Sequence, residues 1–285
     1  MDIRTIGVIG AGTMGNGIAQ VCATAGYPVV ITDIAPAALE RAMKTIDTSL
    51  DRMVNKQKMT ASDKAAALAR LTTSTEMKAL ADCDLVIEAA TENIGLKQKI
   101  FAAIDAVVKP DALIASNTSS ISISKLAAAT KRPSQFIGMH FFNPVPVMAL
   151  VELIRGMQTS DDTLAAVRAV VVKIGKAPIV VRNSPGFAVN RILVPMLNEA
   201  CFALGEGVAT PEDIDEGMKL GCNHPIGPLA LCDMIGLDVM LDVMNVFYES
   251  FKDSKYRPAP LLVEMVEAGY LGRKSGRGFY RYDKK

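Results

Sequence analysis

Scarce residue types set the first limits on this chain of 285 residues. It has no tryptophan, two histidines and an aromatic share of 5%. It has no run of about 18 apolar residues, so no transmembrane helix is expected. Its 31 basic and 30 acidic residues leave a net charge of +1. Because so small a charge creates no long-range field, the sequence predicts neither a nucleic-acid partner nor an anionic membrane partner.

Cysteine is also sparse, and its pattern excludes two kinds of site. The five cysteines are odd in number and form no C-x-x-C pair. This pattern is typical of reduced, buried thiols in a cytosolic protein rather than of disulfides or a metal site. For this reason we expect no bound metal. The N-terminus leads into an apolar strand without a signal-peptide pattern, so we expect a cytoplasmic location. The cysteines are Cys22, Cys83, Cys201, Cys222 and Cys232.

The first two thirds of the chain alternate β-branched runs with helical stretches. Strands are predicted at residues 5–9, 28–32, 85–89, 112–115, 136–139, 150–154 and 179–181. Helices are predicted at residues 14–25, 36–58, 62–70, 96–108 and 162–174. Alternation of this kind predicts an α/β fold of the Rossmann type, a doubly wound and mainly parallel sheet with helices on both faces.

The pattern changes at Asn183-Ser184-Pro185-Gly186, after which strand signals almost disappear. Helices are predicted at residues 189–204, 211–220, 229–251 and 260–268. We therefore expect a sheet domain at residues 1–183 and a smaller all-α domain at residues 184–285.

A glycine-rich segment follows the first predicted strand and opens the first helix. Gly10-Ala-Gly12-Thr13-Met14-Gly15 fits the pattern G-x-G-x-x-G, and its position between strand and helix makes a dinucleotide site credible. Gly10 permits a tight turn, Gly12 lets a pyrophosphate approach the backbone, and Gly15 lets the helix pack close to the strand. The helix N-terminus then offers amide groups and a partial positive charge to the phosphates.

Asp33 lies 18 residues after Gly15, just beyond the second predicted strand. A carboxylate at this place bonds a ribose 2′-hydroxyl and repels a 2′-phosphate, which favours NAD over NADP. Arg41, farther along the chain, tempers that preference because a basic group could accommodate a phosphate.

His140 is the leading candidate for an acid–base group. An alcohol–ketone oxidoreductase needs a side chain that takes and returns a proton near neutral pH, and histidine suits this task. His140 lies in His140-Phe-Phe-Asn143-Pro144, whereas His224 lies in a proline-rich turn typical of a structural residue. Taken alone, His140 could equally be a core histidine packed by its phenylalanine neighbours.

Three segments together resemble the L-3-hydroxyacyl-CoA dehydrogenases. They are the H-F-F-N-P run, the Asn117-Thr-Ser119-Ser run, and Asn183-Ser-Pro-Gly-Phe-Ala-Val-Asn190-Arg. The likeness reaches Gly272-Arg-Lys-Ser-Gly near the C-terminus and is strongest to stand-alone bacterial 3-hydroxybutyryl-CoA dehydrogenases. The resemblance implies reversible oxidation of a 3-hydroxyacyl-CoA, in which His140 takes the hydroxyl proton and NAD takes the hydride.

The resemblance also implies partners for His140. Glu152 matches the acid that pairs with the histidine, and a returning strand would bring it to the imidazole. Ser119 and Asn190 match residues that bond the reacting oxygen, which would place the site between the two domains. Taken alone, Ser119 could be a helix N-cap, Glu152 a strand-end charge and Asn190 a helix-surface amide.

Cofactor and substrate positions follow from the same resemblance. The cofactor set is Gly10, Gly12, Thr13, Met14, Gly15, Asp33, Glu92, Lys97, Ser119, Asn143 and Lys274. Ser49 and Lys56 match positions that meet coenzyme A, and Ser119 and Asn190 meet the acyl part. Without the resemblance, Lys56 would be taken for one solvated cation in Asn-Lys-Gln-Lys.

Two rival functions stay open. One is a dehydrogenase of a small free 3-hydroxy acid, and the other is a nucleotide-binding structural or sensor protein without catalysis. A homodimer through the helical domain is also expected. The apolar residues that suggest it are Met234, Leu237, Met240, Leu241 and Met244, although a buried helix would show the same pattern.

Overall fold

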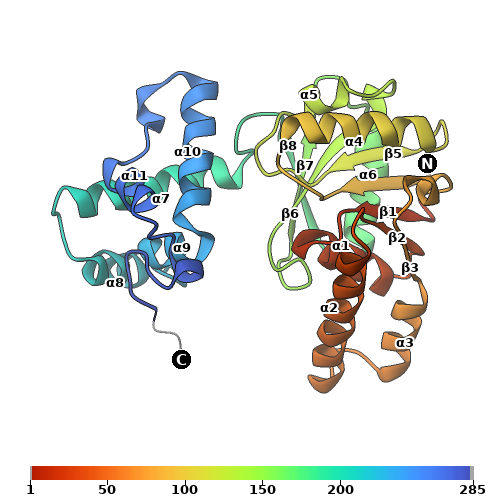
Figure 1. The fold of residues 1–285 in the computed structure, drawn as a ribbon, viewed down its shortest axis with the longest axis horizontal. Helices are drawn as coiled ribbons and strands as arrows, with labels where there is room; N and C mark the ends of the chain where they lie inside the picture. Colours follow the sequence, from red (N-terminus) through yellow and green to blue (C-terminus); the bar gives the residue numbers. More distant parts are fainter. Residues whose placement is uncertain (1, 283–285) are drawn as a thin grey trace. The chain divides into compact units, whose positions relative to one another are not determined.

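The computed structural model describes residues 2–282 and divides into two compact units between Ser184 and Pro185 (Figure 1). The first unit holds an eight-stranded sheet in the order β3-β2-β1-β4-β5-β6-β7-β8. All neighbouring strands run parallel except β6 and β7, which confirms the mainly parallel sheet. The strands are β1 (Ile6–Ile9), β2 (Val29–Thr32), β3 (Leu71–Ser74), β4 (Leu85–Glu88), β5 (Leu113–Ser116), β6 (Phe136–Phe141), β7 (Leu150–Arg155) and β8 (Ala177–Arg182).

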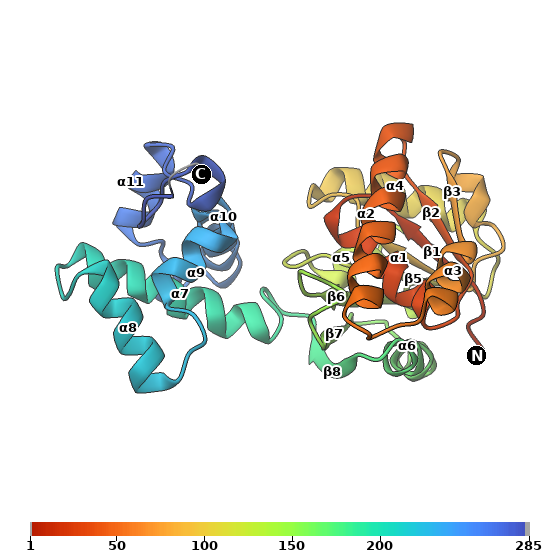
Figure 2. The same cartoon turned by 90° about the horizontal axis from the view of Figure 1, so that it is seen from below.

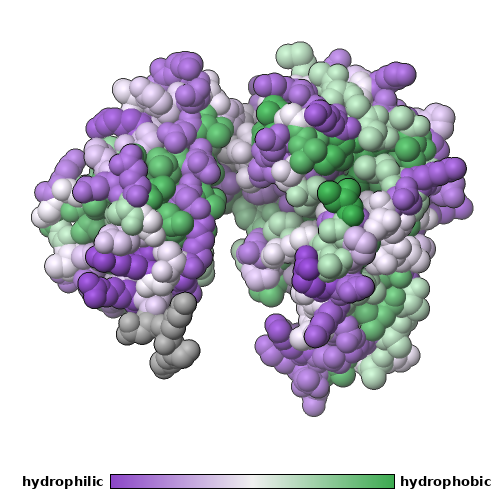
Figure 3. All heavy atoms as spheres, in the orientation of Figure 1, coloured by the Kyte–Doolittle hydropathy of each residue, from purple (hydrophilic) through white to green (hydrophobic). Residues whose placement is uncertain are grey.

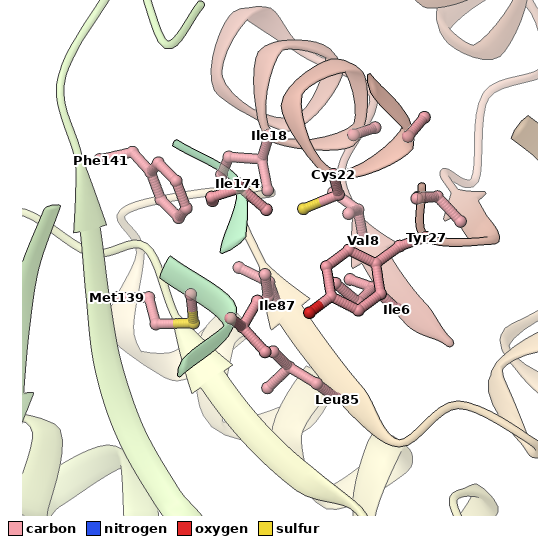
Figure 4. Packing of buried hydrophobic residues seen from close by; sticks show 14 of the residues in the cluster. Ile6, Val8, Ile18, Cys22, Tyr27, Leu85, Ile87, Met139, Phe141 and Ile174 are labelled. Carbon is pink, nitrogen blue, oxygen red and sulfur yellow. The ribbon is translucent and has the colours of Figure 1, made fainter. Parts of the chain in front are cut away.

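Helices cover both faces of this sheet, as the alternating pattern predicted (Figure 2). On one face α1, α2 and α6 contribute apolar side chains to one buried cluster with the strands, which includes Ile18 and Cys22 of α1 and Val8 and Ile87 of the sheet (Figure 4). On the other face α4 packs through Phe101, whose ring meets that of Phe136 at 4.8 Å between centroids. The helices are α1 (Thr13–Thr24), α2 (Pro36–Asn55), α3 (Ala61–Ala69), α4 (Ile94–Val107), α5 (Ile123–Ala127) and α6 (Asp161–Lys173).

The sequence patterns missed or misplaced some elements of the first unit. Strand β3 was not predicted, because it lies at the sheet edge, buries only Leu71 and carries no apolar run. Strand β6 extends two residues beyond the predicted end, so His140 lies inside a strand. The cap of α5 is Ser122, whose side chain accepts a hydrogen bond from the Lys125 amide, and not Ser119.

The second unit is helical and has its own apolar core. It consists of α7 (Val189–Gly205), α8 (Pro211–Cys222), α9 (Pro228–Ile235), α10 (Leu237–Phe251) and α11 (Pro260–Glu267). The predicted helix at residues 229–251 was wrong as one element, because Gly236 with φ of 106° separates α9 from α10. Leu237, Met240 and Met244 are buried in the core of this unit, so these three do not supply the surface expected for a dimer.

Two further expectations concern single residue types. Four cysteines are buried, but Cys222 at the end of α8 is exposed, which corrects the expectation of uniformly buried thiols. Within residues 2–282, no helix has the length and apolar character to span a membrane.

Candidate active site

The glycine-rich loop joins β1 to α1 at the carboxyl edge of the sheet. Gly10 has φ of +97°, and a Cβ there would lie 2.6 Å from the Cα of Ala90. A Cβ on Gly15 would lie 1.8 Å from the carbonyl oxygen of Gly10, so only glycine permits this approach of helix to loop. A Cβ on Gly12, in contrast, would meet no atom within 4 Å. The loop is therefore tight on the protein side and open where a ligand would approach.

The start of α1 fits a dinucleotide. Its N-cap is Gly12, which has no side chain to cap the helix. The first amides of the helix therefore keep their capacity to donate to phosphate oxygens. Asp33 follows β2, and its carboxylate accepts hydrogen bonds from the amides of Ala11 (2.8 Å) and Ala35 (3.0 Å). These bonds fix the Asp33 carboxylate beside the loop, which is the place expected of a residue that binds the ribose of a dinucleotide.

His140 and Glu152 lie directly opposite each other on the antiparallel strands β6 and β7. Nδ1 of the imidazole lies 2.7 Å from Oε2 of Glu152. His140 is 5% exposed and Glu152 is fully buried, so little water screens the pair. The Phe142 ring lies 4.5 Å from the imidazole, centroid to centroid. The returning strand thus brings the carboxylate to the imidazole as expected.

Ser119 lies in the segment after β5 and is held by Glu92. The Ser119 amide (2.7 Å) and hydroxyl (3.0 Å) both donate to Oε1 of Glu92, while the Thr118 hydroxyl donates to Oε2 (2.8 Å). Two residues that the resemblance assigned to one site are therefore neighbours. Glu92 lines a cavity of about 200 Å³ at the carboxyl ends of β4 and β5. Its lining is Met14, Ala89, Ala90, Thr91, Glu92, Lys97 and Asn117.

Lys97 is a buried cation in this region. Its Nζ lies 2.5 Å from Oε2 of Glu88, and the Ser116 hydroxyl donates to the same oxygen at 3.0 Å. The Glu88 carboxylate offsets the cost of removing the Lys97 charge from water. Oε2 of Glu92 lies 3.9 Å from the same Nζ. The sequence reading missed Glu88, although a carboxylate inside the apolar run at residues 85–89 was a visible signal.

Asn117 fastens β6 next to His140. The last paired residues of β5 and β6 are Ser116 and Gly138, so backbone pairing stops before the histidine. The Asn117 side chain continues it, because its Oδ1 accepts a hydrogen bond from the Phe141 amide at 2.9 Å. Asn117 was part of the quoted Asn-Thr-Ser-Ser run, but no pattern in the sequence distinguished its role from that of Ser119.

A groove of about 460 Å³ lies between α1, α2 and the loop after β6. Ser49 lines it from α2, together with three cations, Arg41, Lys44 and Arg52. Of these, the sequence singled out only Arg41, as a base that could accommodate a 2′-phosphate. Figure 3 shows hydrophilic side chains over much of α2. Asn143 lines the groove from the loop after β6. The full lining is Thr13, Asn16, Gly17, Gln20, Arg41, Lys44, Thr45, Thr48, Ser49, Arg52, Asn143, Pro144, Val145 and Pro146.

Lys56 is not among the residues that line this groove. It is the exposed C-cap residue of α2, one helical turn beyond Arg52. Lys44 and Arg52, which share the groove with Ser49, were missed because helical spacing alone does not tell which face of α2 meets the loop after β6.

The remaining predicted site residues belong to the second unit. Asn190 lies in the first turn of α7. Lys274 pairs with Asp238 of α10, with 2.5 Å between Nζ and Oδ2. Burial alone would raise the pKa of Asp238, but the hydrogen bond and charge of Lys274, together with hydrogen bonds from backbone amides, hold that pKa below its usual value. Lys274 therefore has a structural partner within its own unit.

Comparisons with known proteins agree along the whole chain. Residues 5–184 match the family model described as 3-hydroxyacyl-CoA dehydrogenase, NAD binding domain, and residues 186–282 match the C-terminal domain of the same family. A 3-hydroxybutyryl-CoA dehydrogenase of Bradyrhizobium diazoefficiens is 55% identical over 280 residues, which cover 98% of this chain and 96% of the relative. A probable 3-hydroxybutyryl-CoA dehydrogenase of Bacillus subtilis is 50% identical over 285 residues, covering 100% and 99%.

A solved structure gives the same likeness in three dimensions. The crystal structure of (S)-3-hydroxybutyryl-CoA dehydrogenase PaaH1 from Ralstonia eutropha matches with a TM-score of 0.98 and 65% sequence identity. The match covers 99% of this chain and 100% of that one.

Proposed function

Because the chain belongs to the 3-hydroxyacyl-CoA dehydrogenase family, we propose that it interconverts (S)-3-hydroxybutyryl-CoA and acetoacetyl-CoA with NAD(H) as the cofactor. The observation that carries this proposal is the buried His140–Glu152 pair at the sheet edge that also holds the glycine-rich loop. The pair supplies the proton chemistry of the reaction, and the loop supplies a place for the cofactor.

The pair acts through the proton arrangement of the imidazole. An ionised carboxylate only accepts hydrogen bonds, so Nδ1 of His140 carries a proton and donates a hydrogen bond to Glu152. In the neutral imidazole the basic atom is then Nε2, which takes the proton from the 3-hydroxyl during oxidation and returns it during reduction. The buried Glu152 charge holds this tautomer and stabilises the imidazolium once it has formed.

The cofactor is held by the loop and by Asp33. The amides at the start of α1 would bond the pyrophosphate, and the Asp33 carboxylate would bond the ribose and disfavour a 2′-phosphate. When bound, NAD supplies the acceptor for the hydride from C3. We assign Glu92, Lys97, Ser119, Asn143 and Lys274 to the same cofactor site.

Ser119 and Asn190 act on the reacting oxygen in this proposal. A hydroxyl and an amide can both donate hydrogen bonds to a ketone oxygen, where negative charge develops during reduction. Glu92 fixes the backbone of Ser119 through the bond from its amide, so the serine is already ordered before substrate binds.

The groove on α2 is the proposed site of the coenzyme A phosphates. Arg41, Lys44 and Arg52 place three cations beside Ser49, and cations at such a groove complement a phosphorylated ligand. This charge favours a CoA thioester over a small free 3-hydroxy acid, which would not reach all three. The presence of His140, Glu152 and Ser119 together disfavours a catalytically silent sensor.

Assembly and location complete the proposal. We propose a cytoplasmic homodimer formed through the helical unit, acting in the metabolism of short fatty acyl and butanoyl thioesters. Large apolar side chains exposed on that unit support the dimer: Ile192 on α7 is 72% exposed, Leu220 on α8 is 78% and Met234 on α9 is 51%. Sedimentation of the purified protein tests it, because a monomer at working concentration would contradict the dimer.

Turnover tests the function directly. Acetoacetyl-CoA and NADH should give 3-hydroxybutyryl-CoA and NAD. The loss of NADH absorbance measures the rate of this reaction. Assays with 3-ketoacyl-CoA substrates of different chain length and with free acetoacetate, each with NADH and with NADPH, distinguish a dehydrogenase of CoA thioesters from a dehydrogenase of a free 3-hydroxy acid. Preference for free acetoacetate would contradict the CoA assignment, and no turnover with any of these substrates would support the silent protein.

A further inference from the structure

Lys176 is a buried cation that the proposed chemistry does not use. It follows Gly175 at the end of α6 and is 9% exposed. Its Nζ donates to the carbonyl oxygens of Val145 (2.6 Å) and Met148 (2.7 Å). No carboxylate within residues 2–282 forms an ion pair with it. Burial lowers the pKa of Lys176, as expected of an ammonium group held by carbonyl groups alone.

Both carbonyls belong to the loop at residues 142–149, which joins β6 to β7. Pro144 and Pro146 have no amide hydrogen, so this loop can make few backbone hydrogen bonds of its own. Its internal bonds are those from the amides of Val147 and Met148 to the Pro144 carbonyl. Lys176 therefore supplies a clamp from outside the loop.

The clamped loop forms one wall of the α2 groove. Asn143 and residues 144–146 line the same groove as Arg41, Lys44 and Arg52. The Val145 side chain is 2% exposed and packs on α1 so closely that a Cβ on Gly17 would lie 2.8 Å from its Cβ. Val145 is thus fixed twice, by α1 through its side chain and by Lys176 through its carbonyl.

We propose that Lys176 is a positioning residue, which holds the loop at residues 142–149 so that its wall of the groove fits the CoA thioester. This inference rests on the proposed function. A shift of a wall by a fraction of an ångström weakens the fit of a bound substrate, although Lys176 itself need not touch it. Asn143 is the one residue of this loop that we assign to the cofactor, whereas the glycine-rich loop and Asp33 are held by other elements. The Kd of NADH should therefore depend on the clamp less than the KM for the thioester does.

The test compares Lys176→Met with Lys173→Met. Methionine keeps the length and apolar stem of lysine but donates no hydrogen bond. Lys173 is the last residue of α6, three residues before Lys176, and it is exposed, with its Nζ over the Tyr27 ring. Its replacement therefore removes one cation without affecting the clamp. Lys176→Met should raise the KM for acetoacetyl-CoA by about tenfold, with a smaller change in kcat and in the Kd of NADH. Lys173→Met should leave all three constants near those of the wild type.

Several outcomes would overturn the inference. An unchanged KM in folded Lys176→Met would exclude a positioning role. Parallel changes in KM, in the Kd of NADH and in the melting temperature would show a general structural role instead. If Lys176→Met does not fold, Lys176→Arg keeps charge and donors in a different geometry. Its KM should be raised, and an equal KM would also overturn the inference. The wild type is assayed first, because absence of turnover there contradicts the proposed function and not the clamp.

Discussion

Nδ1 of His140 lies 2.7 Å from Oε2 of Glu152, and the two residues are direct partners across the antiparallel strands β6 and β7. Twelve residues of sequence separate them, yet the strand register makes them neighbours. Because both side chains extend to the same side of an antiparallel pair, the sheet itself fixes their distance. An acid–base group held by strands is more precisely placed than one held by a mobile loop.

Replacement of His140 by alanine should abolish most turnover. Loss of a general acid–base group lowers rates by roughly 10²–10⁴-fold, so kcat should fall by that factor. NADH binding should persist, because the glycine-rich loop and Asp33 are unchanged. Steady-state kinetics and NADH fluorescence measure the two quantities. His224→Ala is the matched control, and near-normal turnover of His140→Ala would refute the assignment.

Glu152→Gln should retain the fold and lose activity. Glutamine has the shape of glutamate but no charge, so the imidazolium formed during oxidation loses its stabilising partner. We expect kcat to fall by about 10²-fold or more, within the range for general acid–base catalysis. Circular dichroism checks the fold. Activity equal to that of the wild type in a folded variant would show that the carboxylate charge is dispensable.

Asp33 should determine the choice of cofactor. Loss of a hydrogen bond to a charged group costs about 1.5–3 kcal/mol, which is about 10–100-fold in affinity. Asp33→Asn should therefore weaken NADH binding by about that factor and reduce the preference for NADH over NADPH. The measurement is kcat/KM with each reduced nicotinamide. Equal use of both cofactors by the wild type would contradict the role of Asp33.

Asp84 should contribute stability that acid removes. Burial would raise the pKa of Asp84, but the ion pair with Lys109 and hydrogen bonds from the amides of Arg4 and Thr5 hold it below its usual value. A lowered folded-state pKa adds stability above the unfolded value of about 4, and this stability disappears as pH falls through the folded value. Asp84→Asn should lower the melting temperature at neutral pH and flatten its decline below about pH 4.

The exposed neighbour Asp82 provides the control for this experiment. Asp82→Asn should change the melting temperature little at either pH. If wild type and Asp84→Asn lost stability in parallel on acidification, the ion pair with Lys109 would not be the cause.

Thiol reagents should distinguish one cysteine from the others. Burial raises the pKa of Cys22 and that of Cys83 to about 12, so neither forms thiolate at neutral pH. Cys201 and Cys232 are also buried, and only Cys222 is exposed. The native protein should react rapidly at Cys222 alone, and Cys222→Ser should remove that reaction. Rapid native labelling of Cys222→Ser would show that a buried thiol becomes accessible.

Local sequence patterns predicted most helices and strands of the first unit. The glycine spacing was informative because each glycine has a steric reason: Gly10 for its turn and Gly15 for the approach of α1. Strand β3 was missed because edge exposure weakens the apolar alternation on which the prediction rests. The break at Gly236 was missed because the apolar spacing continues through it, although the backbone does not.

The sequence by itself determined the family, the order of strands and helices along the chain, and the residue types of the acid–base pair. These features depend on spacing within short segments, which local sterics and apolar periodicity control. Only the tertiary structure decided that Glu88 neutralises Lys97, that Arg41 and Arg52 share a groove with Asn143, and that Lys176 clamps the loop after β6. Such contacts join residues on different elements, and register and packing choose them after the sheet has formed.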